Sequence, residues 1–466
     1  MNIKKYLLLF LCLPYFMQAK TITISRLTCE MQEGLVVVEG SPRLGWVMES
    51  PENGTRQSAY EIDIREAFTG RSVWNSGKVY STQSQLVSIE GADIRPDNPF
   101  NYSWRVRVWD ETDAPSEWSR EAKFRSASSR LSEGKWIGAI TRQNAHLPEG
   151  RKFHGGELKK PEVKAAWEAV DTLAKKSICL RRTFQVGDRA EGNTNRQSGK
   201  KIVEATAYVC GLGFYEFSLN GKKVGNSEFA PLWSDYDKTV YYNTYDVTEQ
   251  LRHGENAVGI LLGNGFYNVQ GGRYRKLQIS FGPPTLLFEL VINYEDGTST
   301  TLRSDNDWKY DFSPVTFNCI YGGEDYDARR EQKGWNQVGF DDSHWRPVVI
   351  QEAPKGILRP QMAPPVKIME RYDIQKVTKL NAEQVASASV STKRTVDPSA
   401  FVLNMGQNLA GFPEITVRGK RGQKVTLIVA EALTEEGACN QRQTGRQHYY
   451  EYTLKGEGDE TWHPRF

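Results

Sequence analysis

A strong net charge is missing from this 466-residue sequence, in which 60 basic residues stand against 57 acidic ones. The resulting charge of +3 at pH 7 is too small to attract a polyanion through a bulk electrostatic field. Lysine and arginine are scattered along the chain rather than gathered in a stripe, so the sequence lacks the footprint of a nucleic-acid-binding protein. We therefore expect no nucleic-acid partner.

Cysteine is also scarce. The sequence contains six, namely Cys12, Cys29, Cys179, Cys210, Cys319 and Cys439. Their wide spacing excludes a small disulfide scaffold, and no CxxC or cysteine–histidine spacing indicates a zinc site. We expect the thiols to be small buried hydrophobic groups, although an oxidising compartment would permit one or two incidental bridges. We expect no metal ion and no cofactor.

The motifs of several large enzyme classes are absent as well. No Gly-x-Ser-x-Gly elbow is present, which argues against an α/β hydrolase. The stretches Gly263–Gly265 and Gly271–Gly272 are followed by neither a Lys-Ser/Thr pair nor a helix, so they are not phosphate loops. The turn Asp341–Ser343 lacks the regular oxygen spacing of a calcium-binding EF-hand.

A long apolar run lies at the N-terminus of the sequence. Lys4 and Lys5 precede the run Tyr6–Phe16, and the small residue Ala19 follows at a position suited to cleavage. This is the layout of a secretory signal peptide, and the run is shorter than the about 20 apolar residues that a membrane span needs. We predict a signal peptide over residues 1–19, a secreted or periplasmic protein, and no membrane span after cleavage.

Aromatic residues, in contrast, are abundant, at 11% of the sequence with 12 Trp and 21 Tyr. Aromatic and β-branched residues favour sheets over helices, and helical periodicity is almost absent along the chain. Flat ring faces also suit carbohydrate binding, because they stack on the C–H faces of sugars. The alternative is that these rings fill the cores of the sheets.

Residues 20–127 are predicted to form one β-sandwich. The segments Ala59–Ile64 and Tyr102–Trp109 alternate apolar and polar residues, as half-buried strands do. This alternation places Trp104 and Val106 on one face of the second segment. Turn-forming clusters separate the strands at the spacing of a fibronectin type III-like or immunoglobulin-like sandwich.

Residues 128–353 are predicted to form a jelly-roll sandwich. The dipeptides Asn220-Gly221 and Asp296-Gly297 follow strand-like segments and predict tight hairpins. Ahead of them, Pro161–Lys176 has apolar residues at helical spacing and is expected to form a short helix. The polar stretch 189–200 is expected to be a hairpin tip or a disordered insertion.

A third β unit is predicted over residues 366–466, after a proline-rich stretch, residues 354–365, that marks a linker or a strand-crossing connection. Its expected strands include Phe401–Met405, Glu414–Arg418 and Lys424–Glu431. No closing strand follows, so we expect this unit to be incomplete. The predicted fold class is all-β: a fibronectin III-like sandwich, then a jelly-roll sandwich, then an incomplete third β-sandwich.

A series of aromatic- and glycine-rich segments runs through the sequence. They are Ser41–Trp46, Gln57–Tyr60, Trp74–Val79, Trp104–Asp110, Trp136–Ala139, Gly211–Glu216, Leu219–Gly225, Trp233–Tyr236, Thr244–Thr248, Leu262–Tyr267, Tyr321–Arg329, Phe340–Trp345, Met405–Gly411 and Val429–Leu433. In order and spacing, the series resembles the N-terminal domains of bacterial α-L-rhamnosidases. Residues 366–466 resemble the concanavalin-like β-sandwich that precedes the catalytic domain in that family.

The resemblance implies a secreted glycoside hydrolase that releases terminal α-L-rhamnose from plant glycans or glycosides. It also implies that the catalytic acid and base lie on an (α/α)₆ barrel downstream of the sandwiches. No comparable helical stretch occurs in this sequence, so we expect a truncated, non-catalytic N-terminal portion with no catalytic residues of its own. The alternatives are a stand-alone carbohydrate-binding or adhesion protein, and an inactive gene remnant. The expected partner is a rhamnose-containing glycan or glycoside.

Two groups of residues are candidates for substrate binding. Glu324 and Asp325 lie in a glycine-rich loop that could meet a sugar pocket; the alternative is that the nearby Asp327 serves a turn or pairs with Arg329. Trp233 and Asp235 follow a proline in a loop of the jelly roll. An exposed tryptophan beside a carboxylate could stack on a sugar and bond its hydroxyls, whereas the alternative is that Trp233 closes the edge of the sandwich.

Overall fold

The computed structural model describes residues 22–95, 101–126, 131, 133–149, 152–187, 200–274, 276–388, 400–442 and 447–466. Strands make up 42% of the chain and helices 7%, which confirms the predicted all-β class. The described chain forms two compact units, one of residues up to 125 without 37–39, the other of residues 37–39 and 126–466. The predicted signal peptide and most of the polar stretch 189–200 lie outside the described residues.

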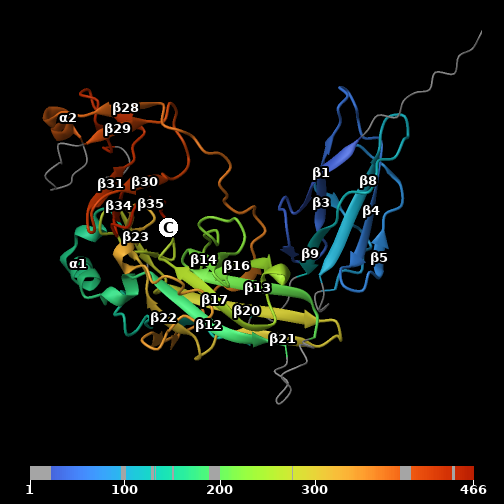
Figure 1. Cartoon of the computed structure of the whole chain (residues 1–466), viewed down its shortest axis with the longest axis horizontal. Coiled ribbons are helices and arrows are strands. Elements are labelled where there is room, and N and C mark those ends of the chain that lie inside the picture. The colour runs from blue at the N-terminus through green and yellow to red at the C-terminus, as the bar shows by residue number, and fades with distance from the viewer. Residues whose placement is uncertain are drawn as a thin grey trace, which may run out of the picture. The chain divides into compact units, whose positions relative to one another are not determined.

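Strands between residues 23 and 126 form two sheets, as a fibronectin III-like sandwich requires. One has the strand order β1-β3-β7 and the other β2-β9-β8-β4-β5, with β6 paired to β4. The strands are β1 (Thr23–Cys29), β2 (Val36–Val38), β3 (Arg43–Glu49), β4 (Ala59–Glu66), β5 (Ser72–Asn75), β6 (Val79–Tyr80), β7 (Val87–Ser88), β8 (Tyr102–Trp109) and β9 (Ala122–Ser126). Figure 1 shows β4 and β8 side by side in this sheet.

The alternation seen in the sequence sets the faces of β8. Trp104 and Val106 are buried on the core side, as predicted. On the opposite face the Arg105 guanidinium lies 3.0 Å from the Asp63 carboxylate of β4. Because successive side chains of a strand point to opposite faces, one strand supplies both the apolar core and the charged cross-strand pairs.

The jelly roll consists of a seven-stranded sheet, β26-β10-β20-β13-β16-β27 with β21 beside β20, and a six-stranded sheet, β15-β14-β17-β12-β22-β25. The first contains β10 (Ile137–Gly138), β13 (Ile202–Leu212), β16 (Thr239–Asp246), β20 (Thr285–Tyr294), β21 (Ser299–Arg303), β26 (Val349–Ile350) and β27 (Ile357–Pro360). The second contains β12 (Ile178–Val186), β14 (Tyr215–Leu219), β15 (Lys222–Lys223), β17 (Gly254–Leu262), β22 (Lys309–Phe312) and β25 (Arg346–Pro347).

The largest cluster of buried apolar side chains lies between these two sheets. Every residue of β20 is buried, as expected for a central strand that is covered on both faces. The ring of Phe288 in β20 packs 5.3 Å from the fully buried indole of Trp308 and 5.7 Å from the ring of Phe217 in the opposite sheet. These contacts join the two layers of the sandwich.

Both predicted hairpins are confirmed. β14 pairs with β15 across Asn220 and Gly221, which have positive φ angles of 52° and 83°, and two such residues are what a type I′ turn needs. β20 pairs with β21 across the turn that contains Gly297, with φ of 79°.

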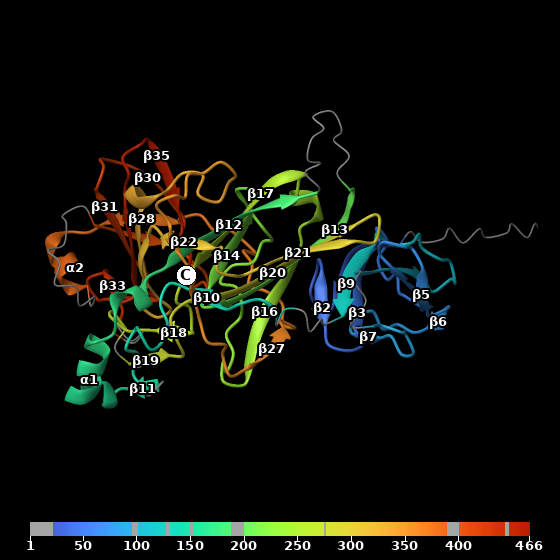
Figure 2. The ribbon, with the colours of Figure 1, turned by 90° about the horizontal axis from the view of Figure 1, so that it is seen from below.

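A small helical segment lies beside the jelly roll, as Figure 2 shows. The predicted helix is shorter than expected: α1 covers Pro161–Glu168, and a 3₁₀ turn, Thr172–Lys175, follows it. Trp167 and Ala174 are buried in a small cluster of their own. The neighbouring strands are β11 (Lys152–His154), β18 (Asn268–Val269) and β19 (Leu277–Ser280).

The proline-rich stretch is a strand-crossing connection, one of the two alternatives that the sequence left open. Its residues Ile357–Pro360 form β27, which pairs in parallel with β16 of the jelly roll. A proline at the end of an edge strand is tolerated, because a ladder hydrogen bond from its nitrogen is not needed there.

The strands of the third unit begin at β28 (Lys376–Lys379), and the short helix α2 (Ala382–Ser387) follows. The others are β29 (Phe401–Asn404), β30 (Ile415–Arg418), β31 (Lys424–Ile428), β32 (Ala432–Leu433), β33 (Cys439–Asn440), β34 (Tyr449–Thr453) and β35 (Asp459–Trp462). β31 and β34 join β23 (Val315–Cys319) and β24 (Gly323–Asp327) in one sheet of order β23-β24-β34-β31. The residues predicted as a second and a third domain therefore share a sheet, which we call the seam sheet.

The ribbon of β28 and β29 has one uncovered apolar face. Val377 pairs with Leu403, and Phe401 lies two residues from Leu403 on the same face. Their exposed fractions are 59%, 43% and 52%. The opposite face carries Val402, which packs against the small cluster around Val385. An isolated two-stranded ribbon is marginally stable in water, and an apolar surface of this kind favours association.

Phe401→Thr is expected to reduce self-association and 8-anilinonaphthalene-1-sulfonate binding while changing the free energy of unfolding by less than about 0.5 kcal/mol, because the side chain is half exposed. Leu454→Ala, in the same unit but 1% exposed, should cost about 2–5 kcal/mol. Light scattering and urea unfolding measure the two effects. An equal loss of stability in both variants would contradict an uncovered ribbon.

Candidate functional site

The seam sheet positions three of the acidic residues singled out in the sequence. β24 pairs in parallel with β34, in register from Asp325↔Glu451 to Asp327↔Thr453. Gly323 begins β24 with φ of +87°, and a Cβ there would lie 2.0 Å from the Tyr449 carbonyl oxygen. Only glycine lets the two backbones approach this closely, which explains why the acidic residues follow a Gly-Gly pair.

Glu324 is fully buried. Its Oε2 accepts hydrogen bonds from the backbone N–H groups of Arg465, at 3.0 Å, and Phe466, at 2.9 Å. Its Oε1 has no hydrogen-bond partner among the described residues. Burial raises the pKa of this carboxyl to about 8, and the two backbone N–H groups only partly oppose that rise. The carboxyl is therefore protonated at neutral pH and holds the chain around residue 465 against the jelly roll.

Glu460 shows how a second buried glutamate behaves with more donors. Its carboxylate accepts from the backbone N–H groups of Lys455 at 2.9 Å and Gly456 at 2.7 Å, and from the Tyr452 hydroxyl at 2.8 Å. Burial alone would raise the pKa of Glu460, but these donors together lower it below its ordinary value. Additional donors and weaker desolvation together favour the charged form of Glu460 over that of Glu324.

Asp325 is engaged in an ion pair. Both of its carboxylate oxygens lie 2.5 Å from Nη2 of Arg273. The Arg273 guanidinium also lies 3.5 Å from the ring centroid of Tyr449 and 4.3 Å from that of Phe317. An arginine held between two rings and a carboxylate is a rigid structural clamp.

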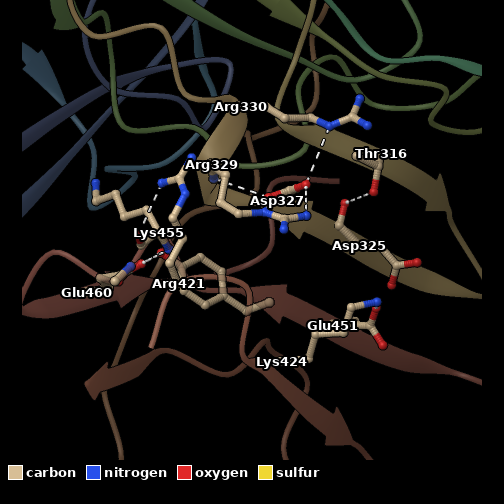
Figure 3. Close-up of polar contacts among 12 residues, drawn as sticks. Thr316, Asp325, Asp327, Arg329, Arg330, Arg421, Lys424, Glu451, Lys455 and Glu460 are labelled. Atoms are coloured by element: carbon tan, nitrogen blue, oxygen red, sulfur yellow. Dashed lines mark hydrogen bonds and ion pairs between the residues drawn. The ribbon is translucent and has the colours of Figure 1, made fainter. Parts of the chain in front are cut away.

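The pairing of Asp327 with Arg329, offered as an alternative in the sequence, is present. Figure 3 shows the two side chains facing each other, with Arg330 on the other side of the carboxylate. The Asp327 oxygens lie 2.8 Å from Nε and Nη2 of Arg329 and 3.5 Å from Nε of Arg330. The Arg329 side-chain bonds lower the pKa of Asp327 against the effect of burial. Asp327 also caps the 3₁₀ turn that follows β24.

Trp233 and Asp235 lie in the loop between β15 and β16. The Trp233 side chain is 62% exposed. It is therefore not buried at the edge of the sandwich core, which was the alternative considered from the sequence. Its ring centroid lies 5.3 Å from that of Phe266. Asp235 accepts from the backbone N–H of Asp237 at 3.3 Å and lies 3.4 Å from the Lys238 ammonium, so its carboxylate both shapes the turn and remains half exposed.

The four predicted binding residues do not converge on one pocket. Trp233 and Asp235 are open to solvent, Asp325 is held by Arg273, and Glu324 is enclosed beneath Phe466. Hydrolysis of a glycosidic bond needs two carboxyl groups that flank an accessible sugar. Glu324 cannot be one of them in this arrangement, because no part of it reaches the surface.

Sequence reasoning missed several residues that organise this region. Phe466 packs so closely on Gly263 that a Cβ there would lie 2.4 Å from its ring. Arg465 donates to Glu216 at 3.2 Å and contacts His463 at 3.1 Å. The signal available in the sequence was Gly263 itself, since a glycine at the end of a strand often marks a close approach of another segment. Nothing in the neighbouring sequence identifies Phe466 as that segment.

An open surface hollow of about 690 Å³ lies elsewhere on the same unit. It is lined by Gln332, Lys333, Gly334, Gln337, Val338, Gly339, Phe340, Asp341 and His344. Within the described ranges, no cluster of three or more His, Cys, Asp or Glu side chains could hold a metal ion, and none of the described helices is long and apolar enough to cross a bilayer. The five cysteines of the described chain are free, and four are buried, as expected.

Three protein-family models match successive parts of this chain. Residues 24–129 match the "Rha78A-like, N-terminal immunoglobulin domain" and residues 200–370 the "Alpha-L-rhamnosidase N-terminal domain". Residues 394–466 match the "Bacterial alpha-L-rhamnosidase concanavalin-like domain". The three matches follow one another in the order predicted from the sequence. The chain carries the N-terminal domains of the bacterial α-L-rhamnosidase family.

Individual α-L-rhamnosidases align along nearly the whole chain. One from Formosa agariphila is 33% identical in an alignment 451 residues long that covers 93% of this chain and 43% of that protein. The solved α-L-rhamnosidase from Dictyoglumus thermophilum is 28% identical with a TM-score of 0.69, and covers 96% of this chain and 46% of its own. The Streptomyces avermitilis α-L-rhamnosidase complexed with L-rhamnose is 26% identical with a TM-score of 0.71, covering 96% and 55%. The chain thus spans about half the length of these α-L-rhamnosidases.

Glu324→Gln is expected to flatten the pH dependence of stability. Because the folded pKa of about 8 lies above the ordinary value of 4.5, folding takes up a proton between these values. The free energy of unfolding therefore falls as the pH rises from about 4.5 to about 8, by on the order of 3–5 kcal/mol. The neutral amide should remove this fall, as urea unfolding at several pH values would measure.

Glu460→Gln is the matched control. The folded pKa of Glu460 is lowered, so its stabilisation is present above the ordinary glutamate pKa and is lost as the pH falls through the folded value. The amide should therefore weaken the fold at neutral pH. A Glu324→Gln variant that keeps the wild-type pH profile would contradict the protonated, buried state of Glu324.

Proposed function

We propose that this chain is the non-catalytic N-terminal portion of a secreted α-L-rhamnosidase, a glycoside hydrolase that removes terminal α-L-rhamnose from plant glycans or glycosides. The observation that carries the proposal is the ordered match to three rhamnosidase domains over an all-β chain. The Streptomyces avermitilis relative, solved with L-rhamnose, has the same fold over 96% of this chain, which supports a rhamnose-containing substrate.

The contacts of these acidic residues favour a structural rather than a hydrolytic role for the sandwiches. Each of the best carboxyl candidates is occupied: Glu324 by backbone N–H groups, Asp325 by Arg273 and Asp327 by Arg329. Retaining and inverting glycosidases both need a protonated acid and an ionised partner on either side of the scissile bond. Glu324 has the raised pKa of an acid, but its burial leaves no room for a sugar beside it.

The purified 466-residue chain is expected to release no p-nitrophenol from p-nitrophenyl α-L-rhamnopyranoside. The reason is that Glu324, Asp325 and Asp327, the carboxyl candidates of the seam sheet, are enclosed or paired. The Streptomyces avermitilis α-L-rhamnosidase, assayed in parallel, serves as the positive control. Turnover by this chain that disappears in Glu324→Gln, while the variant remains folded by circular dichroism, would overturn the proposed lack of activity.

Export is a second part of the proposal, supported by the two lysines and the apolar run at the N-terminus. Expression in a Gram-negative host should yield a periplasmic or secreted protein whose first residue is Lys20. Intact-mass measurement of the purified protein checks the cleavage point. Replacing Leu8 and Leu9 by Asp should block export, since a charged run cannot act as the apolar core of a signal. A cytoplasmic protein that retains Met1 would count against export.

A further inference from the structure

Exposed aromatic side chains are concentrated at one place on the jelly roll. Between residues 200 and 349, the described chain exposes two large hydrophobic side chains, Trp233 at 62% and Tyr321 at 38%. Both rings contact Phe266, at centroid distances of 5.3 and 5.9 Å. Tyr321 also lies against Tyr274, at 4.7 Å and an interplanar angle of 32°. We call these four residues the aromatic platform.

Three loops and one tight turn hold the platform. Trp233 belongs to the loop before β16, Phe266 and Tyr274 to the loops that flank β18, and Tyr321 to the turn between β23 and β24. In that turn the backbone N–H of Gly322 donates to the Cys319 carbonyl at 2.8 Å. Segments distant in the sequence thus bring their rings to one end of the sandwich, where ligand sites of β-sandwiches commonly lie.

The Trp233 loop is anchored so that its ring faces solvent. The Leu232 N–H donates to Gln361 at 2.9 Å, and the Ser234 hydroxyl donates to the Thr239 carbonyl at 2.6 Å. Tyr236 is buried, with its ring 5.1 Å from that of Tyr267. Since the residues on both sides of Trp233 are fixed, the indole is presented without the ordering cost that a loose loop would incur on binding.

The chemistry of the platform fits a sugar. The indole and phenol rings offer flat apolar faces, and two hydroxyls, those of Tyr274 and Tyr321, stand on the same array. The half-exposed carboxylate of Asp235 and the exposed Lys238 ammonium lie on the Trp233 loop. A pyranose has the matching surface, with C–H groups on its faces and hydroxyls around its rim. A polypeptide interface would need a larger continuous apolar patch than two exposed rings provide.

We propose that the aromatic platform is a carbohydrate-binding site that stacks a pyranose ring on Trp233, with Tyr321 and Asp235 contacting its hydroxyls. The platform itself contains no enclosed carboxyl pair, so the proposed role is binding rather than hydrolysis. The choice of an L-rhamnoside as the first ligand rests on the proposed function, whereas the stacking itself does not. A site of this kind would hold a glycan near the enzyme between cleavage events.

Saturation-transfer difference NMR on the purified chain tests the site, with methyl α-L-rhamnopyranoside and methyl α-D-glucopyranoside as probes. The wild type should give saturable binding of at least one probe. Trp233→Ala should weaken it at least about tenfold, because the stacking face is lost, and Trp233→Phe should restore part of it. Tyr80→Ala removes a ring that is 75% exposed in the first unit and should leave binding unchanged.

Melting temperatures separate folding from binding, and Trp233→Ala should melt like the wild type because its indole is mostly exposed. No saturable binding of either probe, or binding that Trp233→Ala leaves intact, overturns the site. Trp233-dependent binding of the glucoside alone supports the platform and counts against a rhamnose substrate, so failure of the site and failure of the proposed function give different results.

Discussion

The parallel pairing of β24 with β34 is the constraint on which the rest of the second unit depends. β24 has β23 on one side and β34 on the other. The sheet that begins with strands of the predicted jelly-roll domain therefore continues with strands of the predicted third domain. An uncovered β24 would present unpaired N–H and C=O groups to solvent. The ring of Tyr326 in β24 stacks 5.8 Å from that of Tyr452 in β34, so the seam is held by side-chain packing as well as by its ladder.

Each carboxyl group along the seam sheet is balanced by cations or hydrogen-bond donors close to it. Figure 3 shows carboxylates from both sides of the seam, Asp325 and Asp327 from β24 and Glu451 from β34. Lys424 neutralises Glu451 at 2.8 Å, and arginines neutralise the other two. Glu324 points the opposite way along the strand, into the apolar cluster that contains Phe466, where two backbone N–H groups are its partners. A buried carboxyl with so few donors is better accommodated in its neutral form.

Local signals in the sequence were sufficient for most of the fold. Alternation in Tyr102–Trp109 and the Asn220-Gly221 dipeptide depend on neighbouring residues alone, and both were confirmed. The seam sheet could not be predicted in this way, because Asp325 and Glu451 meet across a long stretch of chain that contains its own strands. The alternation of a single strand does not state which distant strand will lie beside it.

In the candidate site, too, local contacts could be predicted from the sequence and contacts between distant segments could not. The pairing of Asp327 with Arg329 spans two residues and was foreseen as an alternative. The clamp of Arg273 on Asp325 and the anchoring of Glu324 by residues 465 and 466 join distant segments. Trp233 could be singled out from its own loop, but the rings gathered around it, Phe266, Tyr274 and Tyr321, come from other loops. Their convergence is a property of the jelly-roll ends, which no single loop sequence encodes.

The close backbone contact at Gly323 has a consequence for how the chain is made. During synthesis on the ribosome, β24 emerges on the order of a hundred residues before β34. Until then the backbone edge at Gly323 that later receives the Tyr449 carbonyl is unpaired on that side. The seam sheet can therefore close only after Thr453, the last residue of β34 in the ladder, has been synthesised.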